Sequence, residues 1–89
     1  MFEICYTKRF LKELKLAKKR GKNIKKLESI MEKLVDGVAL GTKYSDHNLT
    51  GNYVGRRECH IEYDWLLIYK VEKARIIFER TGTHADLFD

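Results

Sequence analysis

The stretch that decides the fold is "RRECHIEYDWLLIYKVEKARIIFER", residues 56–80. Its middle run, residues 65–71, is apolar on both faces, which predicts a strand in the centre of a sheet. Glu72 and Lys73 supply a turn into the strand-like residues 74–80, and such short connections join antiparallel neighbours. Together with residues 56–62 at its start, the stretch predicts three consecutive antiparallel strands.

The first of these three strands carries two different faces. Successive side chains of a strand point to opposite sides of the sheet, so the residues separate by parity. One face holds Arg56, Glu58, His60 and Glu62. The other face holds Arg57, Cys59 and Ile61. We therefore expect this strand to have one polar face.

The N-terminal part predicts a strand and then a helix. Residues 2–6 include aromatic and β-branched side chains, which favour a strand. Thr7 is suited to cap a helix that runs to about Arg20, where Gly21 ends it. Apolar residues recur in this segment at helical spacing, so one side of the helix should pack on the core.

A second helix is expected directly afterwards. Asn23 can cap it, and Asp36 and Gly37 end it. Its apolar stripe consists of Ile24, Leu27, Ile30, Met31, Leu34 and Val35. So short a link makes the two helices antiparallel neighbours. The predicted class is therefore α+β: an N-terminal strand, an antiparallel helix pair, then three antiparallel strands in one sheet that the helices cover.

Composition narrows the class of protein. With 44% hydrophobic and 35% charged residues, the 89-residue chain has the composition of one small folded domain. No run approaches the roughly 20 apolar residues of a membrane span, and the first residues lack an apolar signal core. We therefore expect a cytoplasmic protein whose Cys5 and Cys59 are reduced.

The charge is unevenly distributed. Residues 1–35 hold 11 Lys or Arg and 4 Asp or Glu, a net charge of +7, whereas residues 36–89 carry a net −2. A basic field of this kind favours nucleic acid or an acidic protein as partner. A helix surface that is merely soluble explains the same charge equally well.

The three histidines are the candidate functional groups. His47 lies in residues 36–52, a glycine-containing loop whose length suggests function and whose Tyr44 and Leu49 indicate that it packs. His60 lies on the polar face of its strand, and His84 follows the last strand. Because strand ends adjoin in an antiparallel sheet, we expect these two histidines to come close.

The tail carries one weak helix signal, and the motifs that are absent exclude several kinds of site. Thr83 and Asp86 form a weak capping signal for a last helical turn. The tight His or Cys spacing of zinc sites is absent, no Ser or Cys stands in a nucleophile turn, and no glycine-rich phosphate loop occurs. The composition instead permits a ribonuclease that uses imidazole as acid and base and arginine for phosphate.

Two runs carry a resemblance to a known family. They are "YSDHNLTGNYVGRRECHIEYDWLLIYKV" at 44–71 and "FERTGTHADLF" at 78–88. They resemble the YafQ-type branch of the RelE/ParE superfamily of type II toxins, through a D-H-x-L-x-G loop, R-[ED]-x-H before D-W-L-L-I-Y, and a terminal R-x-G-[ST]-H-x-x-L-F. The resemblance covers nearly the whole chain and implies a single RelE-like toxin domain over residues 1–89.

This resemblance implies an endoribonuclease that cuts translated mRNA in the ribosomal A site. It implies an acidic cognate antitoxin of the DinJ/RelB kind, and we expect neither cofactor nor metal. The catalytic positions it implies are His47, His60, Asp64 and His84. The RNA-binding positions it implies are Arg57, Glu58, Arg80 and Phe88.

The sequence also departs from this family, and two rival functions stay open. Asn48 and Tyr63 replace prolines that many members carry, and Glu58 is one methylene longer than the aspartate of some relatives.

One rival function is that of a non-enzymatic toxin like the gyrase-poisoning ParE branch, which has no need of the histidines. The other is a plain RNA-binding module, in which lysines would matter and histidines would not.

Overall fold

The sheet has five strands in the order β1-β5-β4-β3-β2 in the computed structural model, which describes residues 2–88. The strands are β1 (Glu3–Tyr6), β2 (His47–Asn48), β3 (Arg57–Glu62), β4 (Trp65–Glu72) and β5 (Arg75–Gly82). β1 is parallel to β5, and the other neighbours are antiparallel. The α+β class and the three antiparallel strands are confirmed, with the apolar β4 in the centre.

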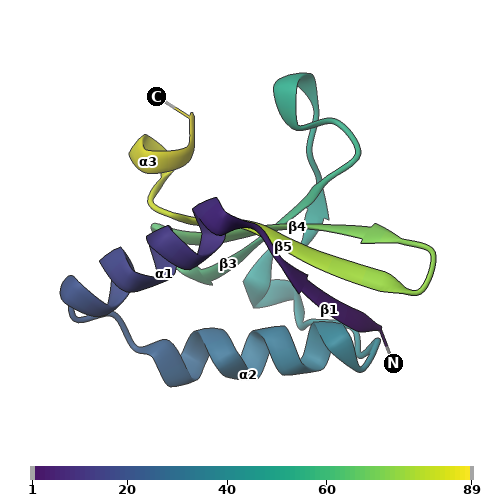
Figure 1. Ribbon diagram of the computed structural model, residues 1–89, viewed down its shortest axis with the longest axis horizontal. Coiled ribbons are helices and arrows are strands. Elements are labelled where there is room, and N and C mark those ends of the chain that lie inside the picture. Colours follow the sequence, from purple (N-terminus) through teal and green to yellow (C-terminus); the bar gives the residue numbers. More distant parts are fainter. Residues whose placement is uncertain (1, 89) are drawn as a thin grey trace.

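The two helices begin where their capping residues predict. α1 (Lys8–Lys19) follows Thr7, whose hydroxyl accepts from the Phe10 N–H, and α2 (Ile24–Val35) follows Asn23, whose side chain accepts from the Lys26 N–H. Figure 1 shows them running in opposite directions, as expected. A cap of this kind stabilises a helix by about 1 kcal/mol.

The main core lies between these helices and one face of the sheet. Its buried side chains include Phe10, Leu27, Ile30, Cys59, Leu67 and Phe78. Cys59 and Ile61 of β3 both point into it, which confirms the predicted apolar parity. Cys59 and Cys5 are free thiols, as expected.

The opposite face of the sheet has a second, smaller core. Leu66 and Ile68 of β4 are fully buried there against Leu87, with Leu49 and Tyr53 packed on them. Leu87 belongs to α3 (His84–Phe88), the predicted last helical turn. Figure 1 shows α3 and the loop before β3 on the side of the sheet away from α2.

Residues 36–52 contain more regular secondary structure than the predicted loop. They contain the 3₁₀ turns η1 (Thr42–Tyr44) and η2 (Gly51–Tyr53) as well as β2. Tyr44 packs on the helix-side core and Leu49 on the opposite one, so the prediction that this segment packs is confirmed. The expectation of a loop histidine is wrong, because His47 pairs with Glu58 across β2 and β3.

A β-bulge in β5 changes which side chains face the second core. Ile68 is opposite Arg80 and Tyr69 is opposite Phe78, so Glu79 is the extra residue. An extra residue breaks the alternation of faces. Phe78 consequently stays in the helix-side core while Arg80 lies beside Ile68.

Within residues 2–88, no helix is both long and apolar enough to cross a membrane.

Candidate functional site

Glu58 joins two of the histidines on the face of β3 that is turned away from the helices. Its Oε1 lies 3.4 Å from Nε2 of His60 and 3.7 Å from Nε2 of His47. Glu58 is only 4% exposed, so the predicted polar face is not an open surface at this position. A buried carboxylate is costly without a partner, which favours holding both imidazoles nearby.

Asp64 and His84 form a second pair at the ends of their strands. Asp64 lies in the two-residue turn between β3 and β4, and its Oδ1 accepts from the backbone N–H of His84 at 2.8 Å and from Nδ1 at 2.5 Å. These two hydrogen bonds lower the pKa of Asp64. An ionised carboxylate can only accept, so Nδ1 carries the proton and Nε2 is left for chemistry.

The two pairs meet. The ring centroids of His60 and His84 are 5.7 Å apart, as the antiparallel strand ends predict. Phe88, one turn later in α3, lies 6.4 Å from the His84 ring and 5.6 Å from Tyr53, edge to face. The structure therefore brings four predicted catalytic residues, Glu58 and Phe88 into one region.

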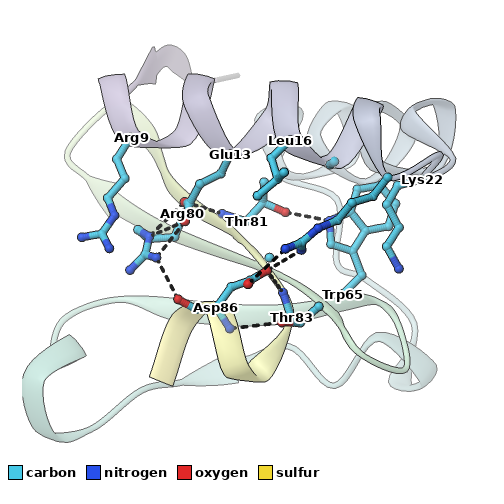
Figure 2. Close-up of a pocket in the computed structure, with 12 residues that line it drawn as sticks. Arg9, Glu13, Leu16, Lys22, Trp65, Arg80, Thr81, Thr83 and Asp86 are labelled. Atoms are coloured by element: carbon cyan, nitrogen blue, oxygen red, sulfur yellow. Dashed lines mark hydrogen bonds and ion pairs between the residues drawn. The ribbon is translucent and has the colours of Figure 1, made fainter. Parts of the chain in front are cut away.

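Arg80 lies behind this region rather than on it. Its side chain is 8% exposed, and its Nε and Nη2 donate to the Glu13 carboxylate of α1 at 2.7 to 3.1 Å. Nη1 donates to the Tyr53 hydroxyl at 2.7 Å, and that hydroxyl donates to the Leu87 carbonyl. Figure 2 shows Glu13 reaching down from α1 to Arg80. The ion pair raises the pKa of Arg80 and fixes it under α3.

Arg57 is the predicted site residue that the fold separates from the histidines. It lies on the other face of β3, where it donates to Asp46 at 3.1 Å and to Asn48 at 2.9 Å. The Tyr69 hydroxyl also donates to Asp46. Arg57 therefore ties the chain before and within β2 to the sheet, on the face opposite Glu58 and His60.

One further contact supports α3, and local sequence patterns hardly indicate it. Asp86 and Thr83 cap each other reciprocally, as their spacing predicts. Asp86 also binds the Arg20 guanidinium through both carboxylate oxygens, at 2.7 and 3.4 Å. Both residues line a cavity of about 170 Å³ between α1, β5 and α3, where Figure 2 labels Asp86. Nothing in the local pattern connects Arg20 with a residue 66 positions later.

Other chemistries find less support among residues 2–88. No group of three or more His, Cys, Asp or Glu has the arrangement of a metal site there. Burial raises the pKa of Cys59 to about 12, which leaves its thiol protonated and unreactive. The chemistry that the site can perform is proton transfer between imidazoles and a bound molecule, with carboxylates that orient the rings.

Comparison with known proteins gives consistent results. A family model described as "Bacterial toxin of type II toxin-antitoxin system, YafQ" matches residues 2–89. The mRNA interferase toxin YafQ of Escherichia coli K12 is 45% identical over 97% of this chain and 95% of its own length.

Two solved structures are also similar. The toxin chain of the E. coli DinJ-YafQ toxin-antitoxin complex superimposes with a TM-score of 0.93 at 44% identity, covering 99% of this chain and 98% of its own. A metal-bound toxin from Helicobacter pylori gives 0.92 at 36% identity, covering 99% and 100%. From the family match and the identity along nearly its full length, the chain belongs to the YafQ family of bacterial type II toxin-antitoxin toxins.

Proposed function

We propose that this toxin cleaves mRNA in the ribosomal A site without a metal, using its histidines for proton transfer to and from the RNA. Membership of the family makes the chain an mRNA interferase, which is an endoribonuclease. The observation that supports this mechanism is the meeting of His60 and His84, each beside its own carboxylate, on one face of the sheet.

The reaction needs one base and one acid. The base removes the proton of a ribose 2′-OH, and O2′ forms a bond to the adjacent phosphorus while the bond from phosphorus to O5′ breaks. The acid donates a proton to the departing O5′. The products are a 2′,3′-cyclic phosphate and a 5′-OH end, so atoms and charges balance without water or a metal.

The surroundings of each imidazole suit these roles. Asp64 orients His84 and would stabilise its protonated form, as a carboxylate does for a catalytic histidine. Glu58 lies within reach of both His47 and His60 and would do the same for whichever ring holds the proton. Base and acid are therefore to be found among three rings on one surface.

The RNA-binding residues are proposed with different geometries. Phe88 is 45% exposed next to His84 and would stack on a base. Arg80 would act on phosphate in competition with Glu13, to which its Nε and Nη2 already donate. Arg57 would reach the backbone of the RNA at the sheet edge, away from the cleaved bond.

The proposed partners follow from the relatives. The E. coli relative forms a complex with its antitoxin DinJ, and we propose that a cognate acidic antitoxin neutralises this chain in the same way, in the cytoplasm. The 11 basic residues among residues 1–35 would suit ribosomal RNA as well as the antitoxin.

The proposal is tested on an RNA that is cut without the ribosome, because chelators also dismantle ribosomes. Cleavage should persist in excess EDTA, leave a cyclic or 3′-phosphate end, and stop when the scissile ribose is 2′-deoxy. His84→Ala should abolish it, whereas Lys33→Gln, an exposed change on α2, should not. Because the H. pylori relative binds metal, activity that disappears with EDTA and returns with a divalent ion would replace this mechanism by a metal-bound hydroxide.

A sulfur substitution then identifies the acid. An RNA whose bridging 5′ oxygen is replaced by sulfur has a leaving group that needs no proton. Such an RNA should restore cleavage to the variant that lacks the acid and not to the variant that lacks the base. Rescue of none among His47→Ala, His60→Ala and His84→Ala would contradict a histidine acid.

A further inference from the structure

The outer edge of β3 is open next to the histidines. β2 pairs with β3 only at Arg57 and Glu58. The segment from His60 to Glu62 is paired with β4 on its inner side, and within residues 2–88 no strand pairs with its outer side. A groove of about 400 Å³ lies along this edge, between it and η1, and its walls include Lys26, Lys43, His60 and Tyr63.

The groove combines cations with aromatic rings. Lys26 Nζ is 3.4 Å from Glu62 and its side chain is half exposed, and Lys43 Nζ lies 5.0 Å from the centre of the Tyr44 ring. Both lysines line the groove, but only Lys26 is paired with a carboxylate there. Tyr44 already packs on the helix-side core, so its ring is partly occupied.

Tyr63 differs from the other aromatic residues. It is 93% exposed, at the tip of the turn between β3 and β4, and its neighbour in the chain is Asp64. An aromatic ring so exposed contributes little to the folded core. It does present a face on which a base can stack, in the same groove as the two lysines.

The groove is continuous with the proposed active site. His60 belongs to both, and Tyr63 precedes the carboxylate that orients His84. An RNA strand with its cleaved phosphate at the His60 and His84 rings would continue into the groove in one direction and toward Phe88 in the other.

We propose that this groove is a subsite for single-stranded RNA, which binds the nucleotide next to the cleaved bond. Tyr63 stacks on the base, and Lys26 and Lys43 contact the phosphate. Single-stranded RNA fits better than a protein segment because phosphates alternating with flat bases match lysines placed beside a bare aromatic ring. This inference rests on the proposed function, whose site it extends.

Binding of a short, fluorescently labelled single-stranded RNA of mixed sequence to the purified full chain tests the subsite. Tyr63→Ala should weaken binding by about 5-fold to 150-fold, the usual range for losing one stacked base, and Tyr63→Phe should recover most of it because the ring remains. Lys26→Gln with Lys43→Gln should lower the salt slope by about 0.7 for each phosphate that the chain no longer neutralises. Lys33→Gln, which removes one positive charge from α2 outside the groove, is the control.

Cleavage assays separate this inference from the proposed function. If His84→Ala abolishes cleavage but Tyr63→Ala binds and cleaves as the native chain does, the subsite is wrong and the function stands. If Tyr63→Ala and Tyr63→Phe lose affinity equally, stacking is wrong. If the lysine variants bind RNA normally and bind antitoxin poorly, the groove belongs to the antitoxin and the proposal is overturned.

Discussion

Replacing Asp86 by asparagine removes the charge that ties α3 to α1 while keeping the size of the side chain. The amide oxygen of the new side chain can still accept from the Thr83 N–H, so the local cap survives. What disappears is the ionic part of the bond to Arg20. We therefore expect the variant to fold with a lower free energy of unfolding at neutral pH.

The size of the effect follows from the pKa of Asp86. Mainly through the hydrogen bond from Arg20, this pKa falls from an ordinary 3.8 to about 2, a difference that corresponds to at most about 2.5 kcal/mol. The Arg20 side chain is 40% exposed, and solvent screens such a pair. We expect a loss of about 1 kcal/mol.

The sign of the pH dependence is also defined. A carboxyl group whose pKa is lower in the folded chain stabilises the fold above its unfolded pKa, and this contribution is lost as pH falls toward the folded value. The difference between the native chain and Asp86→Asn should therefore be full at neutral pH and should shrink as pH falls from 3.8 toward about 2.

Urea unfolding followed by the fluorescence of Trp65, the single and fully buried tryptophan, measures this difference. Glu28→Gln, which changes an exposed carboxylate on α2, is the control. Equal stability of Asp86→Asn and the native chain at neutral pH would refute the reasoning, and so would a difference that stays the same at about pH 3. Since α3 also carries His84, kcat should fall more than KM changes.

Two other substitutions and one labelling experiment test the packing of the chain. In Gly82→Ala the new Cβ would come within 2.9 Å of Asp86, so the free energy of unfolding should drop by about 1–3 kcal/mol, and an unchanged urea midpoint would contradict this tight contact. Glu13→Gln leaves the buried Arg80 guanidinium without its counter-charge and should cost about 3 kcal/mol; a loss below about 1 kcal/mol would mean that water or Tyr53 replaces the pair. The Cys59 thiol, with its pKa raised to about 12 by burial, should react with a thiol reagent only when the chain unfolds, and fast labelling of the folded chain would disagree with its packing.

The sequence alone determined the elements whose causes are local. Thr7 and Asn23 marked the helix starts because a side-chain oxygen caps the N–H groups that follow it. Alternation put Cys59 on the core face, and an apolar run put β4 in the centre. The nearness of His60 and His84 could also be predicted, because it follows from the antiparallel order of the strands.

Only the tertiary structure decided the arrangement around the site. The bulge at Glu79 turns Arg80 toward Tyr53 and Glu13, and the pairing of β2 brings His47 to Glu58. A shift of one residue in a strand reverses the face of every later side chain, and no local pattern records such a shift. Contacts between residues as far apart as Arg20 and Asp86, 66 positions along the chain, form only once the sheet has brought α1 and α3 together.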